Sequence, residues 1–109
     1  MAWIYLVVAG ILEIGWAIGL KYTDGFSRLW PSVMTISAMI ASFVLLAQAL
    51  KSIPVGTGYA VWTGIGAAGT AIIGMAILGE SREILRILCV VLILVGVLGL
   101  KFASGTAAD

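Results

Sequence analysis

The sequence predicts an all-α integral membrane protein that forms a single domain over residues 1–109, with four membrane-spanning helices. Three observations lead to this fold class. First, 62% of the residues are hydrophobic and only 10% are charged, whereas about a quarter of a soluble domain is charged. Second, the apolar residues gather in stretches that can cross a bilayer, which takes about 20 residues each. Third, short polar segments separate these stretches and leave no room for a soluble catalytic domain.

The first helix is expected over about residues 3–20. The chain begins without the basic residues that open a secretory signal peptide, and the apolar run continues past the usual length of a signal core. The run also contains Glu13, which a signal core disfavours. We therefore expect a retained first span. The polar segment 21–28 ends it, and Asp24-Gly25 is a turn signal within that segment.

The second and third helices are expected over about residues 30–50 and 55–78. The break between them, residues 51–54, ends in Pro54. Proline cannot continue a helix but suits the first turn of the next one. This segment is therefore expected to be a short connection between two spans.

The fourth helix is expected over about residues 85–102, after the polar break at 79–83. In that break Ser81 is a candidate N-cap, and Glu83 would lie in the first turn, where acidic residues are favoured. The tail, residues 104–109, is small and polar, and we expect it to be frayed.

Connections this short make neighbouring helices antiparallel, and four spans bring both termini to one side of the membrane. Basic residues in short loops favour the cytoplasmic side. The side of the termini carries Lys51 and Lys101; the opposite side carries Lys21, Arg28, Arg82 and Arg86. This slight excess favours a cytoplasmic location for the first and third loops, and so weak a bias permits insertion in both orientations.

The residue counts exclude several classes of function. A net charge of +1 gives no field that would gather nucleic acid. The chain has no histidine, and its one cysteine, Cys89, lies in an apolar run and has no partner for a disulfide or a metal pair. We therefore expect no metal, no cofactor, no enzymatic activity and no nucleic-acid partner.

Residues 64–69 match the pattern G-x-G-x-x-G, but a dinucleotide-binding fingerprint requires a preceding strand and a βαβ unit. This glycine-rich stretch lies inside a predicted span instead. Helix bends are common at glycine, so we interpret it as a hinge in the third helix.

Glu13 is the most informative residue, because no other predicted span has an ionisable residue near its centre. A carboxylate at this depth costs roughly 2.5–3.5 kcal/mol on insertion scales, so such residues are usually functional. Burial disfavours the charged form of a carboxyl group, and the group could release its proton when a cation arrives. We expect it to couple proton movement to cation movement. The alternative is a structural hydrogen bond between helices, a role that glutamine would fill at lower cost.

The neighbours of this glutamate fit a cation site. Gly10 and Trp16 lie three residues from it, on the same helical face. Tyr59 and Trp62 share one face of the third helix, and aromatic faces attract cations. Ser42, midway along the second helix, is the candidate hydrogen-bond partner, although a lone serine in a membrane helix often bonds its own backbone.

A route for a solute would have to lie between subunits, because the interior of a single four-helix bundle is filled by its own side chains. An oligomer is therefore expected. In the fourth helix, Gly96 and Gly99 would permit close helix approach, although glycine is common in membrane helices in general.

The sequence resembles the small multidrug resistance transporter family from Met1 to about Phe102. The most specific stretches are residues 13–17, 20–32 and 53–62. The resemblance implies an antiparallel homodimer of four-helix subunits in the bacterial inner membrane, often with dual topology, that exchanges protons for cations. Glu13 of each subunit would bind both. The resemblance also implies a lining for the binding site, made of Gly10, Trp16, Ser42, Tyr59 and Trp62. It implies a hinge in the third helix at Gly64 and Gly66. It further implies a contact between the two subunits at Gly96.

Within this family, the sequence resembles the guanidinium exporter branch. Met39 stands where multidrug members typically carry an aromatic residue, and residues 62–67 and 99–101 also look like that branch. Guanidinium is planar and donates hydrogen bonds to a carboxylate in a fork geometry. We predict a proton-coupled guanidinium exporter that works by alternating access. The alternatives are a quaternary ammonium exporter of the same family and a non-transporting membrane partner or assembly subunit.

Overall fold

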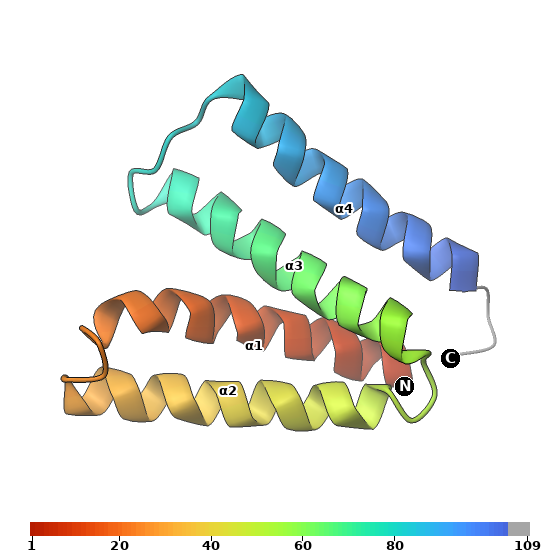
Figure 1. Cartoon of the computed structure of the whole chain (residues 1–109), viewed down its shortest axis with the longest axis horizontal. Helices are drawn as coiled ribbons and strands as arrows, with labels where there is room; N and C mark the ends of the chain where they lie inside the picture. Colours follow the sequence, from red (N-terminus) through yellow and green to blue (C-terminus); the bar gives the residue numbers. More distant parts are fainter. Residues whose placement is uncertain (105–109) are drawn as a thin grey trace.

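A computed structural model describes residues 1–104 as four helices in succession. They are α1 (Ala2–Tyr22), α2 (Leu29–Ala49), α3 (Val55–Ala76) and α4 (Ile84–Ser104), shown in Figure 1. Each of the four is long and apolar enough to cross a membrane. The described part of the chain contains no β-strand. The all-α membrane class predicted from the sequence is therefore confirmed.

The helices end at the polar breaks. The segment between α1 and α2 contains three successive residues with positive φ, namely Asp24, Gly25 and Phe26, at 51°, 70° and 67°. The α3–α4 segment turns at Gly79, with φ 74°. The expectation of a frayed tail concerns residues 104–109; Ser104 is the last residue of α4, and residues 105–109 lie outside the described part of the chain.

The helix α1 is the centre of the arrangement, because it packs against both α2 and α3. The backbone of α4 approaches that of α3 alone, and Figure 1 shows the two diverging from the α1–α2 pair. Among the side chains that the structure describes in α4, only Val90 is buried. An apolar helix this exposed is suited to contact with lipid or with a second subunit.

Glycines allow α1 and α3 to approach closely. A Cβ atom at Gly10 would lie 2.7 Å from a side-chain atom of Ile65. A Cβ atom at Gly66 would collide with the carboxyl group of Glu13, and one at Gly69 would collide with Ile14. Small residues of this kind let membrane helices pack backbone to backbone. The result is that Glu13 lies directly against α3.

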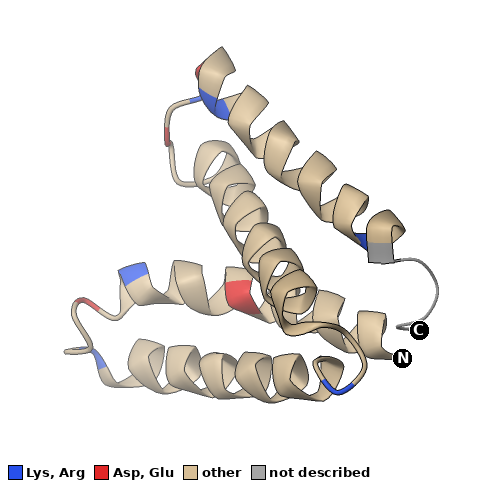
Figure 2. Cartoon of the chain, turned by 45° about the vertical axis from the view of Figure 1, so that its right-hand side comes forward, with Lys and Arg blue, Asp and Glu red and all other residues tan. Residues whose placement is uncertain are grey.

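The charged residues lie mainly at the ends of the helices (Figure 2). Lys21 and Lys101 occupy the last turns of α1 and α4, where cations are favoured by the helix dipole. The Nζ atom of Lys101 lies 4.4 Å from the centroid of the Trp3 ring, so the end of α4 also contacts the start of α1. The exception is Glu13, which lies midway along α1.

Candidate functional site

Glu13 occupies the interface between α1 and α3, with its carboxyl group over Gly66. Its Oε1 atom is buried and has no hydrogen-bond partner among the described residues. A buried polar atom without a partner costs about 1–3 kcal/mol. This oxygen is therefore available to a proton or to a ligand that donates a hydrogen bond.

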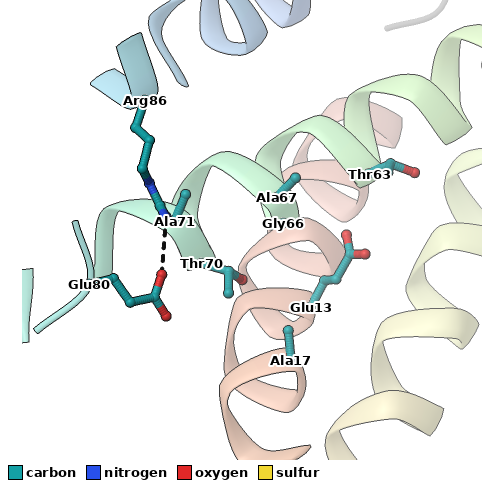
Figure 3. Close-up of a pocket in the computed structure, with 9 residues that line it drawn as sticks. All are labelled: Glu13, Ala17, Thr63, Gly66, Ala67, Thr70, Ala71, Glu80 and Arg86. Carbon is teal, nitrogen blue, oxygen red and sulfur yellow. Dashed lines mark hydrogen bonds and ion pairs between the residues drawn. The ribbon is translucent and has the colours of Figure 1, made fainter. Parts of the chain in front are cut away.

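A cavity of about 330 Å³ opens beside Glu13, between α1, α3 and the start of α4 (Figure 3). Its lining combines small side chains with hydroxyl and charged groups: Glu13, Ala17, Thr63, Gly66, Ala67, Thr70, Ala71, Glu80 and Arg86. The hydroxyl oxygens of Thr63 and Thr70 are buried and have no partner in the part of the chain that the structure describes. These two residues are one heptad apart and share a face of α3. The cavity thus offers two carboxylates, Glu13 and Glu80, and two hydroxyl oxygens as hydrogen-bond acceptors.

An aromatic cluster joins α1, α2 and α3. Trp16 and Phe43 have ring centroids 6.1 Å apart, and Phe43 and Trp62 have theirs 5.7 Å apart. Tyr59 lies on the outer side of Trp62, at 5.6 Å. These separations fall within the range of favourable ring contacts, about 4.5–7 Å. The structure therefore brings together all three aromatic residues that the sequence predicts for the site.

Ser42 holds this cluster in place. Its hydroxyl group donates a hydrogen bond to the backbone oxygen of Ala9, at 2.7 Å, and accepts one from the Nε1–H of Trp62, at 3.0 Å. The Ser42 side chain is fully buried. Its one hydrogen is used by Ala9, so in this conformation Ser42 orients Trp62 and donates no hydrogen bond to Glu13.

None of the residues predicted to line the site with Glu13 borders this cavity: Gly10, Trp16, Met39, Ser42, Tyr59 and Trp62 all lie outside it. Gly10 is buried against Ile65, and Met39 is half-buried on α2. Gly64 faces Val97 of α4, where a Cβ atom would be too close. The helix α3 continues without interruption through both predicted hinge glycines.

Gly96 is exposed on α4, and a Cβ atom placed there would have no neighbour within 4 Å. This face is therefore open for the predicted contact with a second subunit.

Several residues that the structure places at the site were not predicted from the sequence. Phe43 lies one helical turn beyond Met39 and directly follows Ser42, and nothing in this position indicates that its ring contacts Trp16. Thr63 and Thr70 share a face of α3 with Gly66, and that spacing was visible in the sequence. Nothing in the sequence indicated that the α3–α4 segment folds back to the cavity.

Four apolar spans, a carboxyl group midway along the first and an open cavity beside it are the features of a small multi-pass membrane transporter. The profile of the family described as Small Multidrug Resistance protein matches residues 1–93. The chain belongs to this family, as the resemblance in the sequence predicted, and is a multi-pass protein of the inner membrane.

Several relatives are similar over nearly the whole chain. A guanidinium exporter from Yersinia pseudotuberculosis is 65% identical over 104 residues, which cover 95% of this chain and 100% of the relative. One from Escherichia coli is 61% identical, with 95% and 99% covered. One from Salmonella typhimurium is 57% identical, with the same coverage.

Proposed function

We propose that this protein exports guanidinium ions in exchange for protons, as an antiparallel homodimer. The observation that carries the proposal is the Glu13 carboxyl group, which has a buried oxygen without a partner and borders an open cavity. The substrate is supported by three relatives, 57%, 61% and 65% identical, each named a guanidinium exporter.

Exchange follows from competition for one carboxyl group. The charged form of Glu13 binds guanidinium, and the protonated form has no charge with which to hold it. A proton arriving from one side therefore displaces the cation, and a cation arriving from the other side displaces the proton. Coupling requires that the site change sides only when one of the two ligands is bound. We expect the glycines at 64 and 66 to bend α3 during that change.

The lining of the site suits a planar ion rich in N–H donors. Guanidinium forms two parallel hydrogen bonds with a carboxylate, and Thr63 and Thr70 offer further acceptors along α3. Its flat faces stack on aromatic rings, for which Trp16 and Trp62 are the candidates. A quaternary ammonium ion has no N–H donor and would leave these oxygens without partners.

A dimer would complete the pathway. The helix α4 is almost fully exposed in the single chain, and Gly96 offers an open face on it. Two subunits inserted in opposite orientations would each contribute a Glu13, a Tyr59 and a Trp62. The predicted pocket residues lie outside the cavity of one chain, and we expect the pathway between two chains to reach them; they are Gly10, Trp16, Met39, Ser42, Tyr59 and Trp62.

The decisive experiment measures uptake of ¹⁴C-guanidinium into proteoliposomes together with proton release, reported by a pH-sensitive dye inside the vesicles. We expect an imposed proton gradient to drive guanidinium uptake, and Glu13→Gln to abolish it. Glu83→Gln is the matched control, because Glu83 lies in the polar segment before α4 and does not line the cavity. Uptake that persists in Glu13→Gln would refute the carboxylate mechanism.

The same vesicles separate the alternatives. Tetraethylammonium flux greater than guanidinium flux would favour a quaternary ammonium exporter. No flux of either cation, with normal assembly of Glu13→Gln, would favour a non-transporting partner subunit.

A further inference from the structure

We propose that Glu80 forms a second, peripheral binding site for guanidinium at the end of the cavity, and that the side chain of Arg86 occupies this site until the substrate displaces it. The proposal rests on the proposed function, since it concerns the path of the same substrate. It adds a site away from Glu13, in the segment between α3 and α4.

The carboxylate of Glu80 is held in a defined position. The backbone N–H of Glu80 donates a hydrogen bond to the carbonyl oxygen of Gly74, at 3.1 Å. The side chain then lies over Gly74, where a Cβ atom would come within 2.6 Å of Oε1. The turn that permits this fold-back has its positive φ at Gly79. As Figure 3 shows, the result is a carboxylate on the wall of the cavity that contains Glu13.

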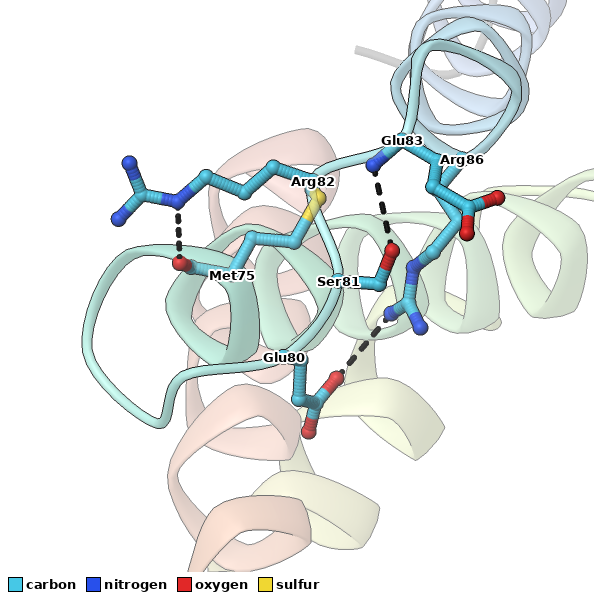
Figure 4. A network of polar contacts seen from close by, with 6 residues as sticks. All are labelled: Met75, Glu80, Ser81, Arg82, Glu83 and Arg86. Carbon is cyan, nitrogen blue, oxygen red and sulfur yellow. Dashed lines mark hydrogen bonds and ion pairs between the residues drawn. The ribbon is translucent and has the colours of Figure 1, made fainter.

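The end of α3 attracts guanidinium groups. Helix C-termini carry partial negative charge on their last carbonyl groups, and Glu80 adds a full negative charge nearby. Two arginine side chains already bind there (Figure 4). Arg82 donates from Nε to the carbonyl oxygen of Met75, at 2.8 Å, and Arg86 donates from Nη2 to Oε1 of Glu80, at 3.1 Å. Because the Arg86 side chain ends in the ion that the protein is proposed to transport, it acts as a tethered analogue of the substrate.

The ion pair between Glu80 and Arg86 is suited to exchange. Both side chains are nearly half exposed, at 45% and 43%, and ion pairs this exposed contribute little to stability. The contact uses one nitrogen and one oxygen, whereas a free guanidinium can form two parallel bonds with a carboxylate. A short tether gives an effective concentration on the order of millimolar, so millimolar guanidinium is expected to compete with Arg86.

One hydroxyl acceptor lies between Glu80 and Glu13. Thr70 lines the same cavity on α3, between Gly66, which contacts Glu13, and Gly74, which contacts Glu80, and its buried hydroxyl oxygen has no partner among the described residues. Thr63 lines the cavity on the far side of Glu13 (Figure 3). Ala67 and Ala71 line the same stretch of α3, and their small side chains leave space in the cavity. A cation that leaves Glu80 can therefore form a hydrogen bond with the hydroxyl oxygen of Thr70 before it reaches Glu13.

The first test detects binding without transport. Protein carrying Glu13→Gln and ¹³C-labelled glutamate is titrated with guanidinium chloride in nanodiscs, at constant ionic strength, and the two remaining carboxylate resonances are followed by NMR. We expect the Glu80 signal to shift saturably at millimolar concentrations and the Glu83 signal to stay in place. Tetramethylammonium, which has no N–H donor, is expected to leave both unchanged. A Glu80 signal that moves no more than that of Glu83 would overturn the proposal.

The second test uses the sign of the change in KM for guanidinium uptake. Glu80→Gln should raise KM about threefold to tenfold, because the charge that concentrates the cation at the cavity is lost. Arg86→Gln should lower KM, because it removes the tethered competitor. Arg82→Gln is the matched control for loss of a positive charge in the same segment, and its KM should stay near that of the unaltered protein. If Glu80→Gln and Arg86→Gln both raise KM, the ion pair is structural and the proposal is wrong.

These outcomes separate the two proposals. A protein that transports no guanidinium but shows the saturable Glu80 shift would refute the proposed function and retain the peripheral site. A protein that transports guanidinium through Glu13, with an unchanged KM in both the Glu80 and the Arg86 variants, would support the proposed function and refute the peripheral site.

Discussion

Gly66 limits where the carboxyl group of Glu13 can lie, and Gly66→Ala tests that limit directly. The three atoms nearest to an added Cβ are Oε1, Cδ and Cγ of Glu13, all within 2.6 Å. Contacts this short force the Glu13 side chain to leave its position. If the displaced carboxylate no longer forms its charge-assisted hydrogen bonds with guanidinium, the loss is about 1.5–3 kcal/mol. At 1.4 kcal/mol per factor of ten, KM for guanidinium should rise about 10- to 150-fold.

The effect on stability should be smaller than the effect on transport. Alanine in place of glycine stabilises a helix by about 0.8–1.0 kcal/mol, and overpacking costs about 1–3 kcal/mol. These opposing effects leave a net loss of about 0–2 kcal/mol in Gly66→Ala. Unfolding in dodecyl sulfate, followed by circular dichroism, measures the stability, and uptake of ¹⁴C-guanidinium measures KM.

Gly56→Ala is the matched control for this prediction, because Gly56 is in the same helix and an added Cβ there would meet no atom within 4 Å. It should gain helix stability and leave KM unchanged. Equal KM values in Gly66→Ala and Gly56→Ala would show that the position of the Glu13 carboxyl group does not depend on the space at Gly66.

Ser42→Ala removes the acceptor of the Trp62 N–H, so the protein should lose about 1–3 kcal/mol of stability. A red shift of the Trp62 fluorescence should report the freed ring. A stability equal to that of the unaltered protein would contradict the role of Ser42 in holding Trp62. Thr70→Val removes a hydroxyl acceptor from the cavity, so it should raise KM for guanidinium and leave that for tetramethylammonium unchanged, and equal effects on both ions would point to simple loss of shape. Because a proton and guanidinium compete for Glu13, guanidinium binding measured by calorimetry should weaken as the pH falls, by up to about tenfold per pH unit for each proton displaced; binding independent of pH would exclude a shared site.

The membrane class and the choice of Glu13 as the candidate site were accessible from the sequence because each depends on local features. Apolar stretches of the length of a span are visible directly, and a lone carboxyl group inside one of them stands out by its cost. The resemblance to the small multidrug resistance family was equally local, since it rested on short motifs around Glu13 and Trp62, and the family profile confirmed it.

The arrangement around Glu13 was not accessible, because it depends on how each helix is rotated about its own axis. Ser42 was expected to serve the glutamate, yet its hydroxyl group faces Ala9 and Trp62. Gly66 was interpreted as a hinge, which stays a prediction, and its contact with Glu13 could not be foreseen without knowing which face of α3 meets α1. Glu80 reaches the cavity through a turn of the α3–α4 segment, which no periodic pattern predicts.

The attachment of α4 has a consequence for biosynthesis. The three earlier helices can form their mutual contacts before α4 leaves the ribosome, because α1 packs against both α2 and α3 while the backbone of α4 approaches α3 alone. At roughly 5–20 residues per second, a helix of 21 residues follows the others by a few seconds. During that interval the surface of α3 that receives α4 is open to lipid, and the exposed face of α4 is the last of the four helical surfaces to be made. Pairing of two chains through that face would therefore begin only after α4 has been made in both.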